Sequence, residues 1–240
     1  MLGIEYLHKK DILYRDLKPE NVLFDDTGHV KLADFSLAKE NVTDSKSSNS
    51  FCGSPAYLPP EMLLQKKSSK ASDIYQIGAV LYEMLVGFPP YFTDNQQKLY
   101  QKIKEAKLQL PAYLSDKARI LLERLLTKNP EERMTITGKG RVNSRRFFKS
   151  LKTDPFFEDF SWEELEQRKL ENPLTGFFTG EEEEYKGPEM EFLNEKLKVN
   201  FRDQDYTEEN KNLMRLKQFS FVRGDDEENK EEEGEEGKQH

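Results

Sequence analysis

The opening residues of the chain have the apolar spacing of a partly buried helix. Within residues 1–10, apolar side chains stand at Leu2, Ile4 and Leu7, at spacings compatible with one helical face. No Ser, Thr, Asp or Asn precedes this run to cap it. The pattern therefore indicates the second half of a helix, and we expect the first half to lie before Met1.

In the segments that follow, the spacing of the apolar residues is first typical of β-strands and then typical of an α-helix. Apolar runs at 21–24 (NVLF) and 30–35 (VKLADF) flank the turn residues DDTGH at 25–29, which predicts a β-hairpin. Residues 40–56 are rich in Ser, Asn and Thr, which predicts a loop. Residues 72–87 are apolar nearly all round, so we expect a central, buried helix there.

Two amphipathic helices are predicted further along, over residues 100–107 and 115–130. We expect Asn129-Pro130 to end the second helix. Its buried stripe consists of four leucines, Leu121, Leu122, Leu125 and Leu126. After Phe157 the pattern becomes irregular. The order of elements predicts a mainly α architecture with one short β-hairpin.

The net charge of −8 is concentrated at the C-terminal end. Residues 225–240 hold nine acids and two lysines, a net of −7, which leaves about −1 for the rest of the chain. Such an acidic run repels itself and buries little apolar area, so we predict a disordered tail over residues 223–240. The remainder has no clustered basic face, which argues against a nucleic-acid partner.

Cysteine content and hydropathy give the cellular setting. The single cysteine, Cys52, forms no internal disulfide, so nothing indicates an oxidising compartment. The longest apolar stretch contains Glu83 and two prolines and is too short to span a bilayer. We therefore expect no membrane span and an intracellular, cytoplasmic location.

Two short blocks carry the residues needed for phosphoryl transfer, YRDLKPEN at 14–21 and ADF at 33–35. This reaction needs mainly positioning and charge neutralisation. Asp16 could take the proton of the attacking hydroxyl, and Lys18 could neutralise the transferred phosphate. The oxygens of Asn21 and Asp34 suit a magnesium ion. Each residue alone could be an ordinary surface side chain. The occurrence of all four together in this order indicates phosphoryl transfer.

The blocks resemble the catalytic loop of Ser/Thr protein kinases, and the Tyr-Arg-Asp form followed by DFSLAKE is typical of the AGC family. SFCGSPAYLPPE at 50–61 resembles the AGC activation segment, and YEMLVGFPPY and NPEERM follow in the family's order. The resemblance implies ATP and Mg²⁺ as cofactors and Ser/Thr-containing proteins as substrates. It implies the helical C-terminal lobe of a protein-kinase-like (α+β) fold over residues 1–157.

The resemblance assigns regulatory roles to residues of the activation segment. Ser50 falls on the phosphorylation site, which implies an upstream activating kinase, and its phosphate would pair with Arg15 and Lys39. The alternative is that Ser50 is one more serine in a Ser-rich loop. Ser54 matches the Thr that bonds to the catalytic Asp and Lys.

Structural roles are implied for three buried charges. Glu61 and Arg133 match the ion pair that fixes the activation segment to the helical lobe. Asp73 matches the helix-start carboxylate that accepts hydrogen bonds from the catalytic-loop backbone, with His8 beside it as a core histidine.

Substrate and nucleotide contacts are implied as well. Glu20 and Glu83 match acids that bind basic residues before the phosphoacceptor; the alternative is that both are solvated glutamates. Leu23 is the clearest adenine-pocket residue. Residues 158–222 resemble the AGC C-terminal extension, in which Phe201 would lie over the adenine and Ser220 would be a second phosphorylation site.

Three departures from the family pattern stand out. Ser36 replaces the glycine of Asp-Phe-Gly, which predicts a strained backbone there. Ala56 and Pro59 replace a Glu and an Ala of the docking segment, which leaves the substrate preference open.

No G-x-G-x-x-G occurs in the 240 residues, and no strand lysine precedes the catalytic loop. We therefore expect a kinase fragment without the N-terminal lobe and its β-sheet, inactive in isolation. The alternative function is a non-catalytic, kinase-derived binding or regulatory module. Four intact catalytic residues favour descent from an enzyme, because a module freed from catalysis has no reason to retain them all.

Overall fold

The computed structural model describes residues 1–25, 28–49, 51–136 and 139–170. Every described residue belongs to the unit Met1–Glu183. Ser50, Phe201 and Ser220 lie outside the described residues, as does nearly all of the predicted C-terminal extension and acidic tail.

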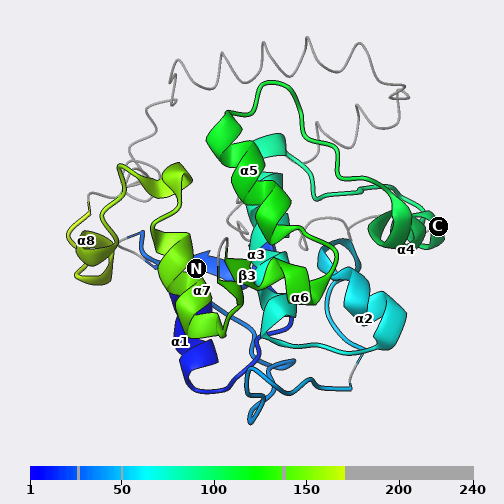
Figure 1. Ribbon diagram of the computed structural model, residues 1–240, viewed down its shortest axis with the longest axis horizontal. Coiled ribbons are helices and arrows are strands. Elements are labelled where there is room, and N and C mark those ends of the chain that lie inside the picture. Colours follow the sequence, from blue (N-terminus) through cyan, green and yellow to red (C-terminus); the bar gives the residue numbers. More distant parts are fainter. Residues whose placement is uncertain (26–27, 50, 137–138, 171–240) are drawn as a thin grey trace, which may run out of the picture. The chain divides into compact units, whose positions relative to one another are not determined.

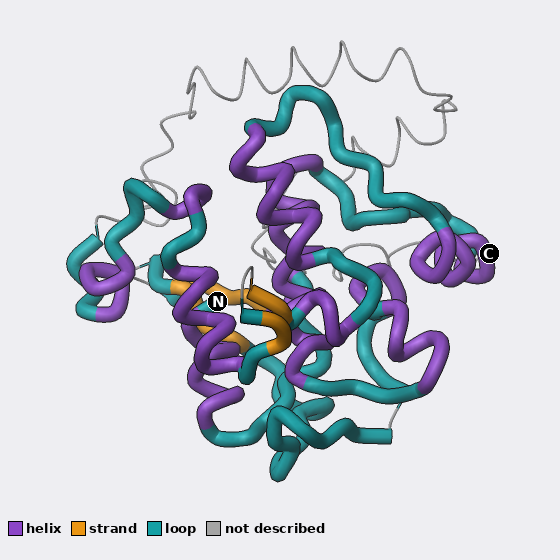
Figure 2. Tube along the Cα trace, viewed as in Figure 1, coloured by secondary structure: helices purple, strands orange, loops and turns teal. Residues whose placement is uncertain are grey.

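The described part is rich in helices and carries two small antiparallel β-hairpins (Figure 2). The prediction of a mainly α architecture is therefore confirmed for these residues. The helices are α1 (Leu2–Lys9), α2 (Pro60–Gln65), α3 (Lys70–Val86), α4 (Gln96–Glu105), α5 (Asp116–Leu125), α6 (Pro130–Arg133), α7 (Ser144–Lys152) and α8 (Trp162–Glu166). The strands are β1 (Val22–Phe24), β2 (Val30–Leu32), β3 (Thr135–Ile136) and β4 (Gly140–Arg141). Short 3₁₀ turns lie at Pro19–Asn21, Pro55–Tyr57 and Pro155–Phe157.

Helix α3 is the buried central helix that the apolar run predicted. Its first turn is closed by a capping box between Ser69 and Ser72, and it ends at Gly87, which adopts φ 93°. A Cβ on Gly78 would lie 2.7 Å from the Cβ of Leu125, so the absence of a side chain lets α5 pack closely against α3. Figure 1 shows the two helices side by side at the core.

The hairpin predicted between residues 21 and 35 is confirmed as β1 paired with β2. Val22 faces Leu32 and Phe24 faces Val30 in the antiparallel register. The second hairpin, β3 with β4, was not expected, because its two-residue strands are too short to show an alternating pattern.

The predicted end of the second amphipathic helix is wrong. Helix α5 stops at Leu125, and Asn129-Pro130 instead begins α6. The Asn129 side chain accepts a hydrogen bond from the Glu131 backbone N–H at 2.9 Å, and Pro130 takes the first helical position, where no N–H is needed. Asn129 and Pro130 therefore mark the start of α6 and not the end of α5.

Helix α7 was missed because its exposed positions are strongly basic. Its other face carries Phe147, Phe148 and Leu151, all fully buried. Helix α1 packs against it (Figure 1), so the predicted first helix is confirmed; no side-chain hydrogen bond caps it at Met1. Among the described residues, no helix is long and apolar enough to cross a bilayer.

Candidate active site

The loop between α1 and β1 is anchored by hydrogen bonds to a fully buried carboxylate at the start of α3. Asp73 Oδ2 accepts a hydrogen bond from the Tyr14 backbone N–H at 2.9 Å, and Oδ1 accepts one from that of Arg15 at 2.8 Å. His8 Nε2 lies 2.8 Å from Asp73 Oδ2. Arg15 has φ 73°, a conformation that these bonds stabilise. The loop backbone is therefore fixed beside Asp16.

Gln76, one turn further along α3, is a second anchor that the sequence patterns did not reveal. Its Nε2 donates to the Arg15 carbonyl at 3.0 Å, and its Oε1 accepts from the Leu17 N–H at 3.2 Å. Both backbone groups flank Asp16. A buried glutamine on an otherwise apolar helix needs hydrogen-bond partners for its amide. The presence of Gln76 within the apolar run of residues 72–87 was therefore the sign in the sequence that it bonds to another segment.

Asp16 lies at the centre of a polar cluster. Its Oδ1 accepts hydrogen bonds from both the backbone N–H and the hydroxyl of Ser54, each at 2.8 Å. Lys18 Nζ lies 3.3 Å from Asp16 Oδ2 and donates to the Ser54 hydroxyl at 3.0 Å. Asn21 Nδ2 reaches Asp16 Oδ2 at 3.2 Å and the Asp16 carbonyl at 2.9 Å. Asp16 is thus in direct contact with Lys18, Asn21 and Ser54.

Asp34 lies just after β2 and is exposed. Hydrogen bonds from the side chain and backbone of Ser36, the latter at 3.1 Å, hold the pKa of the Asp34 carboxyl below its usual value, and Lys18 adds a favourable charge. The carboxylate is ionised at neutral pH. The expected strain at Ser36 is not found: the positive φ, 51°, falls on Asp34.

Tyr14 links the loop between α1 and β1 to the residue before Asp34. Its hydroxyl donates a hydrogen bond to the Ala33 carbonyl. Burial raises the pKa of Tyr14 to about 12, and the charges of Asp16 and Asp34 act in the same direction. The phenol therefore remains a neutral donor throughout the physiological range.

The donor set of Asn21 and Asp34 suits magnesium. Asn21 and Asp34 offer an amide and a carboxylate oxygen, and Mg²⁺ in nucleotide sites takes one or two carboxylates together with phosphate oxygens. The described residues contain no cluster of three or more His, Cys, Asp and Glu that could hold a metal by itself. These two oxygens therefore fit a metal that arrives with a phosphate-bearing ligand.

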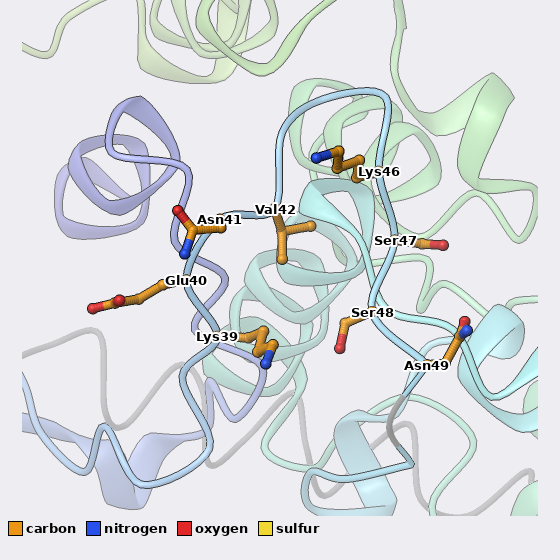
Figure 3. A pocket seen from close by; sticks show the side chains of 8 residues that line it. All are labelled: Lys39, Glu40, Asn41, Val42, Lys46, Ser47, Ser48 and Asn49. Atoms are coloured by element: carbon orange, nitrogen blue, oxygen red, sulfur yellow. The ribbon is translucent and has the colours of Figure 1, made fainter.

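Arg15 points from the loop between α1 and β1 toward residues 37–48. Its Nε donates to the Leu37 carbonyl at 2.5 Å, and its terminal nitrogen lies 3.4 Å from the Ser48 hydroxyl. Lys39 pairs with Leu13 through both backbone groups, at 2.9 Å each, and lines a hollow together with Ser48 (Figure 3). The predicted partner of both cations, Ser50, lies outside the described residues.

The two acids predicted to bind basic residues lie near one tyrosine. The Tyr57 hydroxyl donates to Glu83 Oε2 at 2.5 Å, and the charge of Glu20 also acts on this phenol. Burial first, and then the Glu83 contact, raises the pKa of Tyr57. Tyr57 was not among the predicted site residues. Leu23, the predicted adenine contact, is 46% exposed on β1.

Glu61 and Arg133 form a two-point ion pair inside the helical core. The guanidinium nitrogens lie 2.8 and 3.0 Å from the two carboxylate oxygens. Ser72 Oγ also donates to Glu61 at 2.9 Å, and Arg133 donates to the Ala71 carbonyl at 2.7 Å. The Arg133 guanidinium stacks over the ring of Tyr75 at 4.9 Å. The pair joins α2 to α3 and α6.

Residues 1–148 match the family model described as protein kinase domain. The chain is 40% identical over 174 residues to serine/threonine-protein kinase gad8 of Schizosaccharomyces pombe, covering 72% of this chain and 29% of that protein. It is 34% identical over 222 residues to human protein kinase C delta type, covering 92% and 31% respectively. Protein kinase 2 of Dictyostelium discoideum is 40% identical over 169 residues, covering 70% and 33%. The chain spans about a third of these relatives' length.

Proposed function

The chain belongs to the protein kinase family, its relatives support the AGC type, and on that premise we propose that it is the catalytic region of a Ser/Thr protein kinase. The reaction is transfer of the ATP γ-phosphate to a Ser or Thr hydroxyl of a protein. One observation carries the proposal: Asp16, Lys18, Asn21 and Ser54 form a single hydrogen-bonded cluster. A surface aspartate would not need three such partners.

Each residue of the cluster has a distinct task in this mechanism. Asp16 orients the attacking hydroxyl and takes its proton, and Lys18 neutralises the phosphate being transferred. Asn21 and Asp34 would hold magnesium, which supplies charge neutralisation on the phosphate oxygens. Ser54 holds the Asp16 and Lys18 side chains in their relative positions, because its hydroxyl forms a hydrogen bond with each of them.

The nucleotide base is proposed to lie against Leu23, with Phe201 of the C-terminal extension over it. Basic residues of the substrate, placed before the phosphoacceptor, are proposed to bind Glu20 and Glu83. The Tyr57 hydroxyl holds the Glu83 carboxylate by a hydrogen bond, and a carboxylate fixed in this way supports the assignment of Glu83. Ser50 and Ser220 are proposed as sites of an upstream kinase, with Arg15 and Lys39 pairing to the phosphate on Ser50.

The test is phosphoryl transfer from labelled ATP to a serine peptide with arginines before the serine. It is run on the 240-residue chain and on a fusion that places the glycine-rich lobe of another AGC kinase before Met1. We expect transfer by the fusion and little by the chain alone. A folded fusion that binds ATP but transfers nothing would contradict the proposal.

A second candidate, a non-catalytic binding module, has one observation in its favour. The hairpin exposes Phe24 and Val30, which are paired across its two strands and so lie on one face, by 45% and 61%, and such an apolar face suits contact with another surface. The fusion separates the two candidates, since a module would bind through this face without turnover.

The 240-residue chain should bind magnesium-ATP more weakly than the low-micromolar range. Its sequence contains no G-x-G-x-x-G loop, and such loops supply phosphate contacts that Lys18, Asn21 and Asp34 do not replace. Calorimetric titration measures the affinity, with Asp34→Asn as the control that should remove the remaining magnesium dependence. Low-micromolar binding by the unmodified chain would refute this expectation.

A further inference from the structure

Gln76 bonds to the two peptide groups that enclose the α-carbon of Asp16. Its Nε2 donates to the Arg15 carbonyl at 3.0 Å, and its Oε1 accepts from the Leu17 N–H at 3.2 Å. Peptide groups are planar, so the orientation of these two planes determines the φ and ψ angles of the residue between them. One amide therefore restrains both backbone dihedrals of Asp16, and with them the direction in which its carboxylate leaves the backbone.

The other anchors of this loop restrain different parts of its backbone. Asp73 accepts from the N–H groups of Tyr14 and Arg15, which belong to peptide planes that precede the Asp16 dihedrals. Asn21 Nδ2 donates to the Asp16 carbonyl at 2.9 Å and so restrains the plane after Asp16. Among the described residues, the glutamine amide is thus the hydrogen-bond partner of the plane before Asp16.

The activation segment comes close to the same Arg15 carbonyl. A Cβ on Gly53 would lie 2.9 Å from this oxygen and 3.8 Å from Gln76 Nε2, so the approach requires a residue without a side chain. The next residue, Ser54, bonds to the Asp16 carboxylate through both its N–H and its hydroxyl. A displacement of the Arg15 carbonyl would therefore also move the donors that hold this carboxylate.

We propose that Gln76 is a positioning residue for the phosphoryl transfer, which sets the place of the Asp16 carboxylate relative to the attacking hydroxyl. The inference rests on the proposed function. Gln76 is 2% exposed, so it lies out of reach of ATP and of the protein substrate and acts through Asp16. Displacing a reacting group by about 1 Å can lower a rate by about 10²-fold, so this indirect control is large enough to measure.

In the fusion with the glycine-rich lobe, Gln76→Met should lower kcat by about 10–100-fold and leave the KM values for ATP and the peptide nearly unchanged. Methionine is unbranched and similar in length to glutamine, but it forms neither hydrogen bond. A loss of kcat at constant KM is the mark of an interaction that acts in the transition state. Unchanged kcat, or a loss confined to KM, would overturn the proposal.

Tyr82→Phe is the matched control on the same helix. Tyr82 is 4% exposed, and its hydroxyl donates to the Gln109 carbonyl at 2.9 Å and not to the loop that carries Asp16. This variant thus also removes a hydrogen bond of a buried α3 side chain. It should lower the thermal unfolding midpoint, as Gln76→Met does, and retain kcat. A comparable loss of kcat in Tyr82→Phe would overturn the proposal, because general destabilisation would then explain both variants.

Amide hydrogen exchange in the 240-residue chain tests the contact without catalysis. Gln76→Met should accelerate exchange of the Leu17 N–H by about five- to tenfold, the effect expected for the loss of one hydrogen bond. The N–H groups of Tyr14 and Arg15 should retain their protection, because their bonds to Asp73 are untouched. Unaltered exchange at Leu17 would overturn the proposal whatever the turnover shows. A parent fusion that binds ATP but transfers nothing would contradict the proposed function and the inference with it, so the two failures are distinguishable.

Discussion

Replacing Asp16 by Asn should lower the turnover of the fusion by about 10²–10⁴-fold while leaving the fold intact. The amide has the shape of the carboxylate, and its oxygen can still accept the hydrogen bonds that Ser54 donates. What it cannot do is take the proton of the attacking hydroxyl. The measurement is the turnover number for the serine peptide, with the thermal unfolding midpoint as the check on folding.

Asp34→Asn is the matched comparison, because it makes the same chemical change at a residue with a different task. Its loss should arise from weakened magnesium binding, since an amide oxygen carries no charge to attract the ion. Raising the magnesium concentration should therefore partly restore Asp34→Asn and leave Asp16→Asn inactive. Equal rescue of the two variants would contradict the assigned roles.

Three members of the cluster around Asp16 were predictable together because they are close in sequence. Asp16, Lys18 and Asn21 lie within six residues, so one motif contains them. The anchors that fix the loop were harder to find, since Gln76 contacts it across about sixty positions. Asp73 was found only through the family resemblance. Long-range contacts depend on packing, which a local pattern does not encode.

Errors in the secondary-structure predictions have a similar origin. Asn129-Pro130 is compatible with either a helix end or a helix start, and only the packing of α6 decides between them. Ser36 was expected to be strained on the assumption that the replaced glycine was needed for its backbone angles. The turn instead places the unusual φ on Asp34, where an aspartate tolerates it better than most residues.

Arg133→Met should destabilise the 240-residue chain by about 3–5 kcal/mol, because it leaves the buried Glu61 carboxylate without its counter-charge. Arg133 is fully buried, and Glu61 is 5% exposed, so water cannot replace the lost partner. Ser72 alone would remain bonded to Glu61. Urea unfolding followed by circular dichroism measures the change in the free energy of unfolding.

The control is Lys117→Met, which breaks an ion pair with Glu158 whose two side chains are 47% and 53% exposed. Exposed pairs contribute about 0–1 kcal/mol, so this variant should unfold almost as the parent does. Combining Glu61→Leu with Arg133→Met should cost less than the sum of the single changes, since no unpaired charge remains buried. If Arg133→Met proved as mild as Lys117→Met, the activation segment would have to be held to the helical core by contacts other than this ion pair.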